Sequence, residues 1–444
     1  MELEMRTGVW YHDRPFTVTF PDAWEVTAHW PATPPPLTDE QIRERMHHPT
    51  GQPPLRELAR TARRPIVIVD DLSRPTPVSA IFPHVLEEFY AAGIAPDRVT
   101  VLVATGTHGP QHAAALARKL GPDATQRCHV QIHHDRRHTS TIGRTSFGTP
   151  VAVNRALLQC DLAVGISGIY PQDTTGFGGG AKLALGVLGR RTITHMHYTH
   201  EGVGGSYNID NDFRRDITEI CRMIRLNTIY TLHINARQEV VNLTCGDHYT
   251  YYAEAAAFSK SRYTAPPPTD ADVVIANTYP SDVSYTFMRK GMKVIYGAPV
   301  AATRIVIGSH HEGIGRHGLF PQGKSARYLR VKELYARALI SRPSALPGKI
   351  VKRLFASAAP RPQPSVTGAT RAMAPRPIWL YRPEGSNAVL PRLPGIHQTT
   401  DWQRIITAIE REQSAKQNLR VMVYPCASLQ CVDFAGAAVG AGVE

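Results

Sequence analysis

The chain has 444 residues, of which 42% are hydrophobic and 20% are charged. That length exceeds one ordinary domain, and the composition is that of a globular protein with a real core, which excludes disordered and fibrous classes. No apolar run is long enough to cross a bilayer and the first ten residues do not resemble a signal peptide, so we expect a cytoplasmic protein with no membrane partner.

The formal net charge of +13 is concentrated in one stretch. Residues 304–378 hold 14 Lys or Arg and only two acids, Glu312 and Glu333. A basic patch can bind nucleic acid, but this stretch has few aromatic side chains to stack on bases and no helix-turn-helix or RNA-binding signature. We therefore expect a solvated surface or a field that attracts an anionic substrate, and not a nucleic-acid partner.

In the first half of the chain, short β-branched runs alternate with longer helical patterns. This alternation is typical of α/β architecture. A further helix is expected to begin near Gly180. The other expected elements are strands at 66–70, 99–103, 128–132 and 161–166 and helices at 78–92, 112–120 and 213–226.

The second half of the chain begins after three prolines at 266–268, which lack backbone donors and favour extended chain. They mark an expected domain boundary, and residues 357–377, rich in Pro, Ala and Ser, read as an irregular connection. The expected elements are strands at 271–276, 293–296, 305–307 and 419–424 and helices at 326–340 and 402–411.

These patterns together predict a fold of two α/β domains with the active site in the cleft between them. Residues 1–266 are expected to form the N-terminal domain and residues 270–412 the C-terminal domain. The last segment, 415–444, is expected to return to the N-terminal domain.

Three polar clusters sit just after predicted strands, where open α/β sheets bind their ligands. The first, residues 70–77, reads Asp-Asp-Leu-Ser-Arg-Pro-Thr-Pro, in which carboxylates and Arg74 could hold a hydroxylated anion or could simply cap a helix. The second places His108 in a tight turn between glycines. A histidine there is either a general base or an ordinary loop residue.

A third cluster, residues 176–182, ends a glycine-rich turn with Lys182. It is neither a Walker P-loop nor a clean dinucleotide fingerprint. Glycines allow a ligand to approach the backbone, and a lysine directly after them could react with a cofactor, whereas the plain alternative is a flexible turn with a surface lysine. Downstream, His195, His197 and His200 have a spacing that suits a metal on a helix or strand.

As an ordered set, these clusters resemble the nickel-pincer nucleotide-dependent lactate racemase family. The resemblance is dense between about 66 and 200 and thin after 320. The matching segments are Asp71-Leu72-Ser73-Arg74-Pro75, Ala104-Thr105-Gly106-Thr107-His108, Gly176 to Leu183, Thr192-Ile193 followed by His197, and Tyr279-Pro280-Ser281-Asp282 with Tyr285.

The resemblance implies a cofactor, a nickel pyridinium-3,5-bisthiocarboxylic acid mononucleotide bound covalently to Lys182. His197 would be a nickel ligand and His108 a catalytic acid/base, while Asp71 and Arg74 would contact the nucleotide and the substrate region. Gly178 and Gly179 would lie against the cofactor. It also implies cofactor maturation proteins as partners, so recombinant protein made without them is expected to lack the cofactor.

The chemistry implied is racemisation or epimerisation of a small anionic 2-hydroxy acid. A base takes the hydroxyl proton while the α-hydrogen leaves as hydride to the cofactor, and hydride then returns to either face of the planar 2-oxo acid. The cofactor supplies the difficult step, and the protein positions the substrate and exchanges protons.

The sequence departs from the family at several places. The second catalytic histidine is replaced by Gln172, which cannot exchange a proton near neutral pH; Asp173 or Tyr170 could substitute. The alignment of His197 needs a one-residue gap, so His195 is a competing nickel ligand.

The substrate side departs as well. Tyr285 is retained as an expected substrate contact. The family's substrate-holding Gln and Lys correspond to Thr286 and Arg289, with Lys290 one step out of register. We therefore predict a homologue whose substrate is not lactate.

Two other functions remain open at this stage. The first is a cofactor-binding homologue with lost or redox-only activity, for which Gln172 is the supporting feature. The second is a zinc-dependent hydrolase built on His195, His197 and His200, although no HExxH-type base accompanies them.

Overall fold

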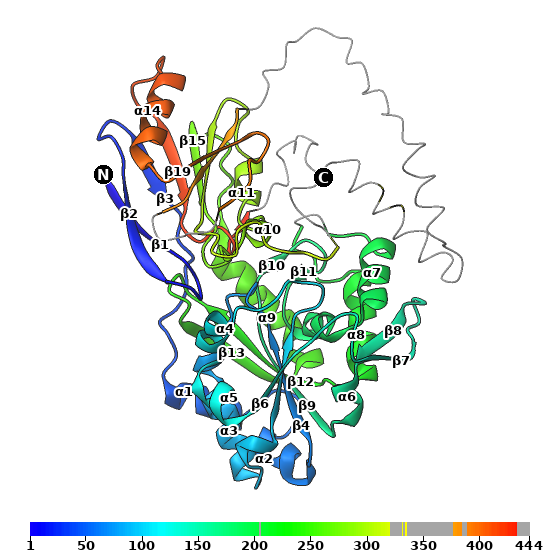
Figure 1. Ribbon diagram of the computed structural model, residues 1–444. Coiled ribbons are helices and arrows are strands. Elements are labelled where there is room, and N and C mark those ends of the chain that lie inside the picture. The colour runs from blue at the N-terminus through cyan, green and yellow to red at the C-terminus, as the bar shows by residue number, and fades with distance from the viewer. Residues whose placement is uncertain (204–205, 320–330, 332–333, 335–375, 384–388, 433–444) are drawn as a thin grey trace.

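The computed structural model describes residues 1–203, 206–319, 331, 334, 376–383 and 389–432. In these residues the chain forms two lobes, each built on a six-stranded sheet with helices packed against it (Figure 1). The α/β fold class is thereby confirmed. The helix expected at 326–340 and the connection expected at 357–377 lie almost wholly outside the described residues, as does most of the basic stretch.

The first sheet has the strand order β13-β12-β9-β4-β5-β6, in which only β13 is antiparallel to its neighbour. The chain runs outward from β4 in both directions, so the strand order reverses beside β4. The strands are β4 (Pro65–Asp70), β5 (Thr100–Ala104), β6 (His129–Ile132), β9 (Leu162–Gly168), β12 (Thr228–Ile234) and β13 (Val240–Asp247).

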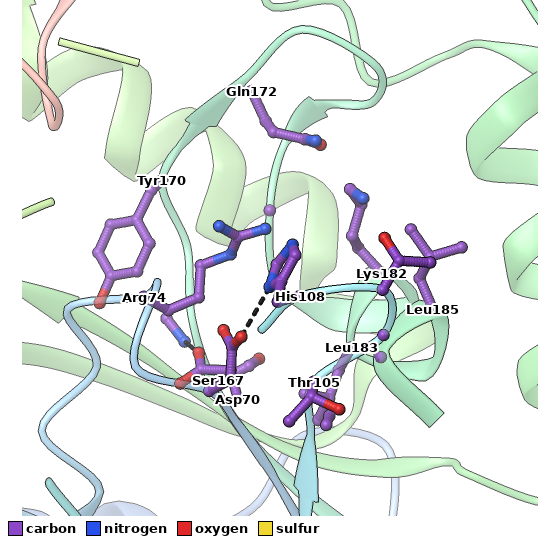
Figure 2. A pocket seen from close by; sticks show the side chains of 18 of the residues that line it. Asp70, Arg74, Thr105, His108, Ser167, Tyr170, Gln172, Lys182, Leu183 and Leu185 are labelled. Carbon is purple, nitrogen blue, oxygen red and sulfur yellow. Dashed lines mark hydrogen bonds and ion pairs between the residues drawn. The ribbon is translucent and has the colours of Figure 1, made fainter. Parts of the chain in front are cut away.

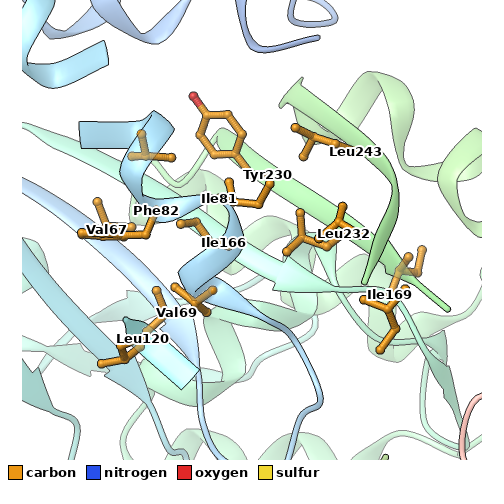
Figure 3. Close-up of a cluster of buried hydrophobic side chains, with 14 of the residues drawn as sticks. Val67, Val69, Ile81, Phe82, Leu120, Ile166, Ile169, Tyr230, Leu232 and Leu243 are labelled. Carbon is orange, nitrogen blue, oxygen red and sulfur yellow. The ribbon is translucent and has the colours of Figure 1, made fainter. Parts of the chain in front are cut away.

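Side chains of β4 alternate between two apolar cores, because successive residues of a strand point to opposite faces. Val67 and Val69 enter one core, which Figure 3 shows, and Ile66 and Ile68 enter the other. All four are buried, and each contributes about 1.5–3 kcal/mol by leaving water. A strand buried on both faces explains the unbroken apolar run in the sequence.

Helices cover both faces of this sheet (Figure 1). Those on the first face are α1 (Asp39–His47), α2 (Leu55–Leu58), α3 (Phe82–Ala91), α4 (Ala113–Leu120), α5 (Pro122–Arg127) and α9 (His248–Tyr263). Those on the second face are α6 (Arg155–Gln159), α7 (Arg190–Thr199), α8 (Asp212–Met223) and the 3-10 helix Gly180–Val187.

Two short hairpins extend the first lobe. They are β7 (Thr139–Arg144) with β8 (Pro150–Asn154), and β10 (Pro171–Gln172) with β11 (Gly176–Phe177).

The second sheet is parallel throughout, with the order β18-β17-β16-β15-β19-β3. Its strands are β3 (Glu25–Ala28), β15 (Val273–Asn277), β16 (Thr303–Ile307), β17 (Ile378–Tyr381), β18 (Ile396–Thr399) and β19 (Arg420–Tyr424). The other elements are the hairpin β1 (Glu2–Thr7) with β2 (Arg14–Thr19), and the helices α10 (Tyr285–Met288), α11 (Lys293–Tyr296) and α14 (Trp402–Glu412).

Both ends of the described chain differ from the expected domain boundaries. Residues 1–28, expected in the N-terminal domain, lie with the second lobe, because β3 pairs with β19 and the hairpin packs on the core around Trp402. Strand β19, expected to return to the first domain, lies between β15 and β3. The chain contacts the first lobe beyond β19. There, β20 (Cys431–Val432) pairs with β14 (Thr264–Ala265), and the Val432 backbone forms hydrogen bonds with the hydroxyl of Tyr207.

The strand expected at 293–296 is instead the helical turn α11. Val294 and Ile295 are both buried in this turn. Adjacent apolar residues show no alternation of polar and apolar side chains, so the sequence does not distinguish a strand from a buried helical turn. The other strand and helix predictions in the described residues are confirmed to within a few residues at their ends.

Candidate active site

The polar clusters that follow β4, β5 and β9 meet in one pocket at the carboxyl ends of these strands, where the strand order reverses. This is where open α/β sheets bind ligands. Two residues of the second lobe, Lys290 and His317, close the pocket from the other side. First-lobe lining residues include Asp70, Asp71, Arg74, Thr105, Gly106, Thr107, His108, Ser167, Tyr170, Gln172, Gly178, Gly179, Lys182 and His197.

His108 is oriented by a buried carboxylate. Its Nδ1 lies 2.6 Å from Oδ2 of Asp71, and the Ser73 hydroxyl donates to Oδ1 of the same carboxylate at 2.6 Å. Burial raises the pKa of Asp71, but the charge and hydrogen bond of His108, together with the charge of Arg74 and the Ser73 hydrogen bond, outweigh burial and hold that pKa well below its usual value. An ionised Asp71 fixes the proton on Nδ1, which leaves Nε2 of His108 as the basic atom.

The loop that carries Asp71 and Arg74 is held from beneath by Lys119 of α4. The Lys119 amine is fully buried, lies 2.7 Å from Oδ1 of Asp70 and donates to the carbonyls of Arg74 and Thr76. Arg74 extends from this loop into the pocket, as Figure 2 shows, and one guanidinium nitrogen donates to the Ser73 hydroxyl at 3.2 Å. The buried lysine therefore sets the position of the pocket's arginine.

Lys182 enters the pocket from the glycine turn (Figure 2). At Gly179, φ is +71° and a Cβ would lie 2.9 Å from the carbonyl oxygen of Gly168, so the turn requires glycine there. The Lys182 side chain is 9% exposed, and burial, with the charges of Arg74 and Arg214, holds its pKa well below the usual value. A neutral amine is the form of lysine that reacts as a nucleophile.

His197 lies beside Lys182, because both contact the ring of Phe213: the Lys182 amine is 5.5 Å from its centroid and the His197 ring 5.1 Å. Nδ1 of His197 donates to the carbonyl of Ile193 at 2.8 Å, which places the lone pair of the neutral ring on Nε2. Burial, then the charge of Lys182, lowers the pKa of His197 to about 3. Metal-binding histidines commonly donate their other nitrogen to a backbone carbonyl in this way.

The neighbouring histidines point elsewhere. His195 does not line the pocket, and its Nδ1 lies 3.1 Å from the Thr149 hydroxyl. His200 donates to Asp216 at 2.7 Å. In the described part of the chain, no three His, Cys, Asp or Glu side chains gather closely enough to hold a metal by themselves. This arrangement does not favour the zinc hydrolase.

Gln172 lines the pocket, with its amide oxygen accepting from Thr174 at 3.0 Å and Thr175 at 2.7 Å. Of its two possible substitutes, Asp173 is exposed and forms an ion pair with Lys293. Tyr170 does line the pocket, but burial and the charge of Asp70 raise the pKa of its hydroxyl well above the usual value. Neither is a ready proton carrier.

The second lobe supplies residues other than those expected. Tyr285, Thr286 and Arg289 are absent from the pocket lining, and the Thr286 hydroxyl donates instead to the carbonyl of Ile314 at 2.6 Å. Lys290, the out-of-register alternative, lines the pocket. Burial, then the charge of Arg74, holds its pKa well below the usual value.

Sequence reasoning missed three residues of the site, namely Ser167, Lys119 and His317. Ser167 ends the buried strand β9 as the polar clusters end β4 and β5, so the same signal was present. Its hydroxyl is buried in the pocket wall and has no hydrogen-bond partner in the described residues. His317 repeats the Gly-x-His-Gly pattern around His108. Nothing in the sequence distinguished Lys119 from a surface lysine.

Comparison with known proteins gives one family. The family model described as the lactate racemase N-terminal domain matches residues 11–203. The lactate racemase of Lactiplantibacillus plantarum is 26% identical over 292 residues, 63% of this chain and 68% of that protein. That of Thermoanaerobacterium thermosaccharolyticum is 26% identical over 308 residues, 65% and 70% of the two chains.

A solved structure shares the fold. The structure of the lactate racemase apoprotein from T. thermosaccharolyticum matches with a TM-score of 0.67 at 18% identity, covering 97% of this chain and all of that one. The chain is thus similar to lactate racemases in the sequence of its N-terminal part and shares the fold of a lactate racemase apoprotein.

Both of these relatives are lactate racemases, and the N-terminal domain match includes the pocket residues of the first lobe. It ends before Lys290 and His317. Among the described helices, none has both the length and the apolar character needed to cross a bilayer.

Proposed function

We propose that this chain racemises or epimerises a small anionic 2-hydroxy acid, using a nickel-pincer nucleotide attached to Lys182. The observation that carries the proposal is the convergence in one pocket of a neutral lysine, a metal-competent histidine and a carboxylate-oriented histidine, namely Lys182, His197 and His108.

The residues present fit this cofactor. Lys182 is a buried neutral amine of the kind that forms an amide-type bond, and His197 presents a neutral nitrogen to a metal. The Ser167 hydroxyl, which has no hydrogen-bond partner among the described residues, is a polar group in the pocket wall to which a ligand would supply a hydrogen bond. Arg74 suits the carboxylate or phosphate groups of an anionic ligand.

When bound, the cofactor supplies a reversible acceptor for the α-hydrogen and its two bonding electrons. Nε2 of His108 takes the hydroxyl proton, and the buried Asp71 stabilises the imidazolium that results. The substrate thereby becomes a 2-oxo acid, and return of the hydrogen and the proton restores the hydroxy acid in either configuration.

The substrate carboxylate is placed by two basic side chains of the pocket. Arg74 and Lys290 face the pocket from opposite lobes, so a small acid between them would be held at the junction of the lobes. Asp70 and Asp71 already have Lys119 and His108 as partners, which leaves Arg74 and Lys290 for the ligand, and an anion bound beside the Lys290 amine would favour its charged form.

A cofactor-binding homologue with lost or redox-only activity is the second candidate function. It is favoured by Gln172, whose amide oxygen is engaged by two threonines and which cannot exchange a proton.

The deciding experiment uses protein produced together with the cofactor maturation proteins. Wild type is expected to carry nickel and a mass adduct mapped to Lys182, and to invert at least one member of a panel of α-deuterated 2-hydroxy acids with retention of deuterium. Lys182→Met is expected to lose adduct, nickel and activity, whereas Lys260→Met, a surface control, is expected to keep all three. An adduct without inversion of any substrate would favour the second candidate; a bare Lys182 in wild type would refute the proposal.

A further inference from the structure

The imidazole of His108 is held by its own lobe along one edge. Its Nδ1 lies 2.6 Å from Oδ2 of Asp71 and 3.3 Å from the hydroxyl of Ser73, so both polar contacts are made to the same ring nitrogen. A ring held along one edge can still tilt, and tilting moves Nε2, the basic atom on the opposite edge. A general base needs that atom within hydrogen-bond reach of the substrate proton. A further contact is therefore needed to fix the direction of Nε2.

The ring of Phe287 supplies this contact, and it comes from the second lobe. Its centroid lies 4.7 Å from that of His108, and the two ring planes meet at 64°. Aromatic rings favour tilted, edge-to-face pairs at such distances. Phe287 is 5% exposed and is absent from the pocket lining, so it contacts His108 on a side away from the ligand.

The position of Phe287 is set by the segment that follows β16. Phe287 belongs to α10, and the first turn of α10 is hydrogen-bonded to that segment. The N–H of Tyr285 donates to the carbonyl of Gly313 at 3.0 Å. Thr286 donates twice to the carbonyl of Ile314, from its N–H at 3.1 Å and from its hydroxyl at 2.6 Å. The short helix and the segment therefore form one structural unit.

The continuation of this segment is docked on the turn that carries His108. His317 forms an antiparallel backbone bridge with His108, and the Gly318 N–H donates to the carbonyl of Thr107 at 2.8 Å. A Cβ on Gly318 would lie 2.7 Å from that carbonyl oxygen, so the close approach requires glycine. The backbones that carry the two rings are thus fixed relative to each other.

We propose that Phe287 is a positioning residue for the catalytic base, holding the His108 imidazole from the second lobe so that Nε2 points at the substrate hydroxyl. The inference rests on the proposed function, in which Nε2 takes that proton. Asp71 and Phe287 belong to different lobes, so the base has its working geometry only when the lobes are docked. Proton transfer by His108 is thereby coupled to the junction of the lobes around the substrate.

The first test compares two buried phenylalanines in matured protein. Phe287→Leu removes the ring but keeps an apolar side chain, and Phe287→Met is a second variant should the leucine variant not fold. Phe82→Leu is the matched control, because it removes a fully buried ring from the core in Figure 3. Urea unfolding measures the stability of each variant, and kcat and KM are measured on a 2-hydroxy acid that wild type inverts.

The two variants should differ in kcat. Phe287→Leu should lower kcat by about 10–10²-fold and change KM by no more than about 3-fold, because a misplaced catalytic group slows the chemical step more than it weakens binding. Phe82→Leu should lose stability and keep the kcat of wild type.

A second comparison shows whether the effect passes through His108. In a His108→Asn background there is no base to position, so adding Phe287→Leu should change the rate of 2-oxo acid formation within one turnover by less than about 2-fold. Substitutions that act through one group are not additive.

The contact itself is tested without the cofactor. In apoprotein that contains isotope-labelled histidine, the ring C–H signal of His108 is assigned from its loss in His108→Asn. The ring current of Phe287 shifts that signal, so Phe287→Leu should move it and Phe82→Leu should leave it in place.

Three results would overturn the proposal. They are equal losses of kcat in the two leucine variants, an undiminished effect of Phe287→Leu in the His108→Asn background, and a His108 signal that does not move. A wild type that inverts no hydroxy acid would refute the proposed function, and the apoprotein spectra would still decide whether Phe287 holds the ring.

Discussion

The two walls of the pocket are built differently. On the first-lobe wall, charged groups are paired beneath the surface: Asp70 with Lys119 and Asp71 with His108. On the second-lobe wall, Lys290 and His317 are the described residues that reach the pocket, and they come from segments outside the sheet. Buried ion pairs fix geometry, whereas residues outside the sheet can change without loss of the fold. The difference suggests that the first wall holds the cofactor and that the second selects the substrate.

The largest expected effect comes from removing Lys119, the buried lysine that supports the first-lobe wall. Lys119→Met leaves Asp70 as an uncompensated buried charge, and we expect the free energy of unfolding to fall by roughly 3–5 kcal/mol. Urea unfolding followed by fluorescence measures it. The matched control is Lys416→Met, which removes an exposed ion pair with Asp272 and should cost about 0–1 kcal/mol. Equal losses in the two variants would contradict a supporting role for Lys119.

Next in size is the loss of His108 orientation. Asp71→Asn keeps the shape of the side chain but no longer stabilises an imidazolium, so kcat of the matured enzyme should fall about 10²–10³-fold with a smaller change in KM. Ser73→Ala, which removes only the hydroxyl that donates to Asp71, should lower kcat far less. If the two substitutions had the same effect, the carboxylate would merely be filling space.

Substitution of two adjacent basic residues, Lys290 and Arg289, tests the second-lobe wall of the pocket. Lys290→Gln should lower kcat/KM about 10–100-fold, mainly through KM, because the amine that would pair with the substrate carboxylate is lost. Arg289→Gln, one residue away and outside the pocket lining, should change kcat/KM by no more than about 3-fold. The reverse order would restore the alignment expected from the sequence and would contradict the position of Lys290 found here.

The smallest expected effect is that Glu312 and Asp71 make the free energy of unfolding depend on pH in opposite directions. Burial raises the pKa of Glu312, in the second lobe, from 4.5 to about 7, with a further contribution from the charge of Asp71. The folded state then holds more protons than the unfolded state between these values, so stability should fall as pH rises through that window. Asp71 has a lowered pKa, so its contribution is present at neutral pH and is lost as pH falls below its unfolded value.

Glu312→Gln should flatten the pH dependence between about pH 4.5 and 7. It should raise the free energy of unfolding at pH 8 by on the order of 1 kcal/mol, because solvent screening weakens the effect of a partly exposed carboxyl group. Urea midpoints at pH 5 and pH 8 measure both effects. An unchanged slope would mean that Glu312 is ionised in the folded protein throughout this range.

The sequence predicts the residues of the first-lobe wall better than those of the second-lobe wall. On the first wall, Asp71, Arg74, His108 and Lys182 follow strands or a glycine turn, and this local signal placed them all in one pocket. On the second wall the choice between Arg289 and Lys290 depends on the course of the turn that follows the one-turn helix α10, and local sequence does not determine that course.

The same distinction applies to the fold. Runs of β-branched residues located the strand at 420–424, but which sheet accepts it depends on pairing across more than a hundred residues. The burial of Lys119 could not be predicted from the sequence for a similar reason, because Asp70, the acid with which it pairs, is 49 positions away in the chain.

The strand β3 has a mechanical consequence. Because β3 lies in the second sheet, the chain starts in one lobe, builds the other, and then goes back, so the described segments 29–38 and 266–272 both connect the lobes. Two attachment points define a line, and any large rotation of one lobe against the other has that line as its natural axis. Cutting either connection alone would leave the lobes tethered but free to swivel, and the alignment of the two walls would then depend on non-covalent packing.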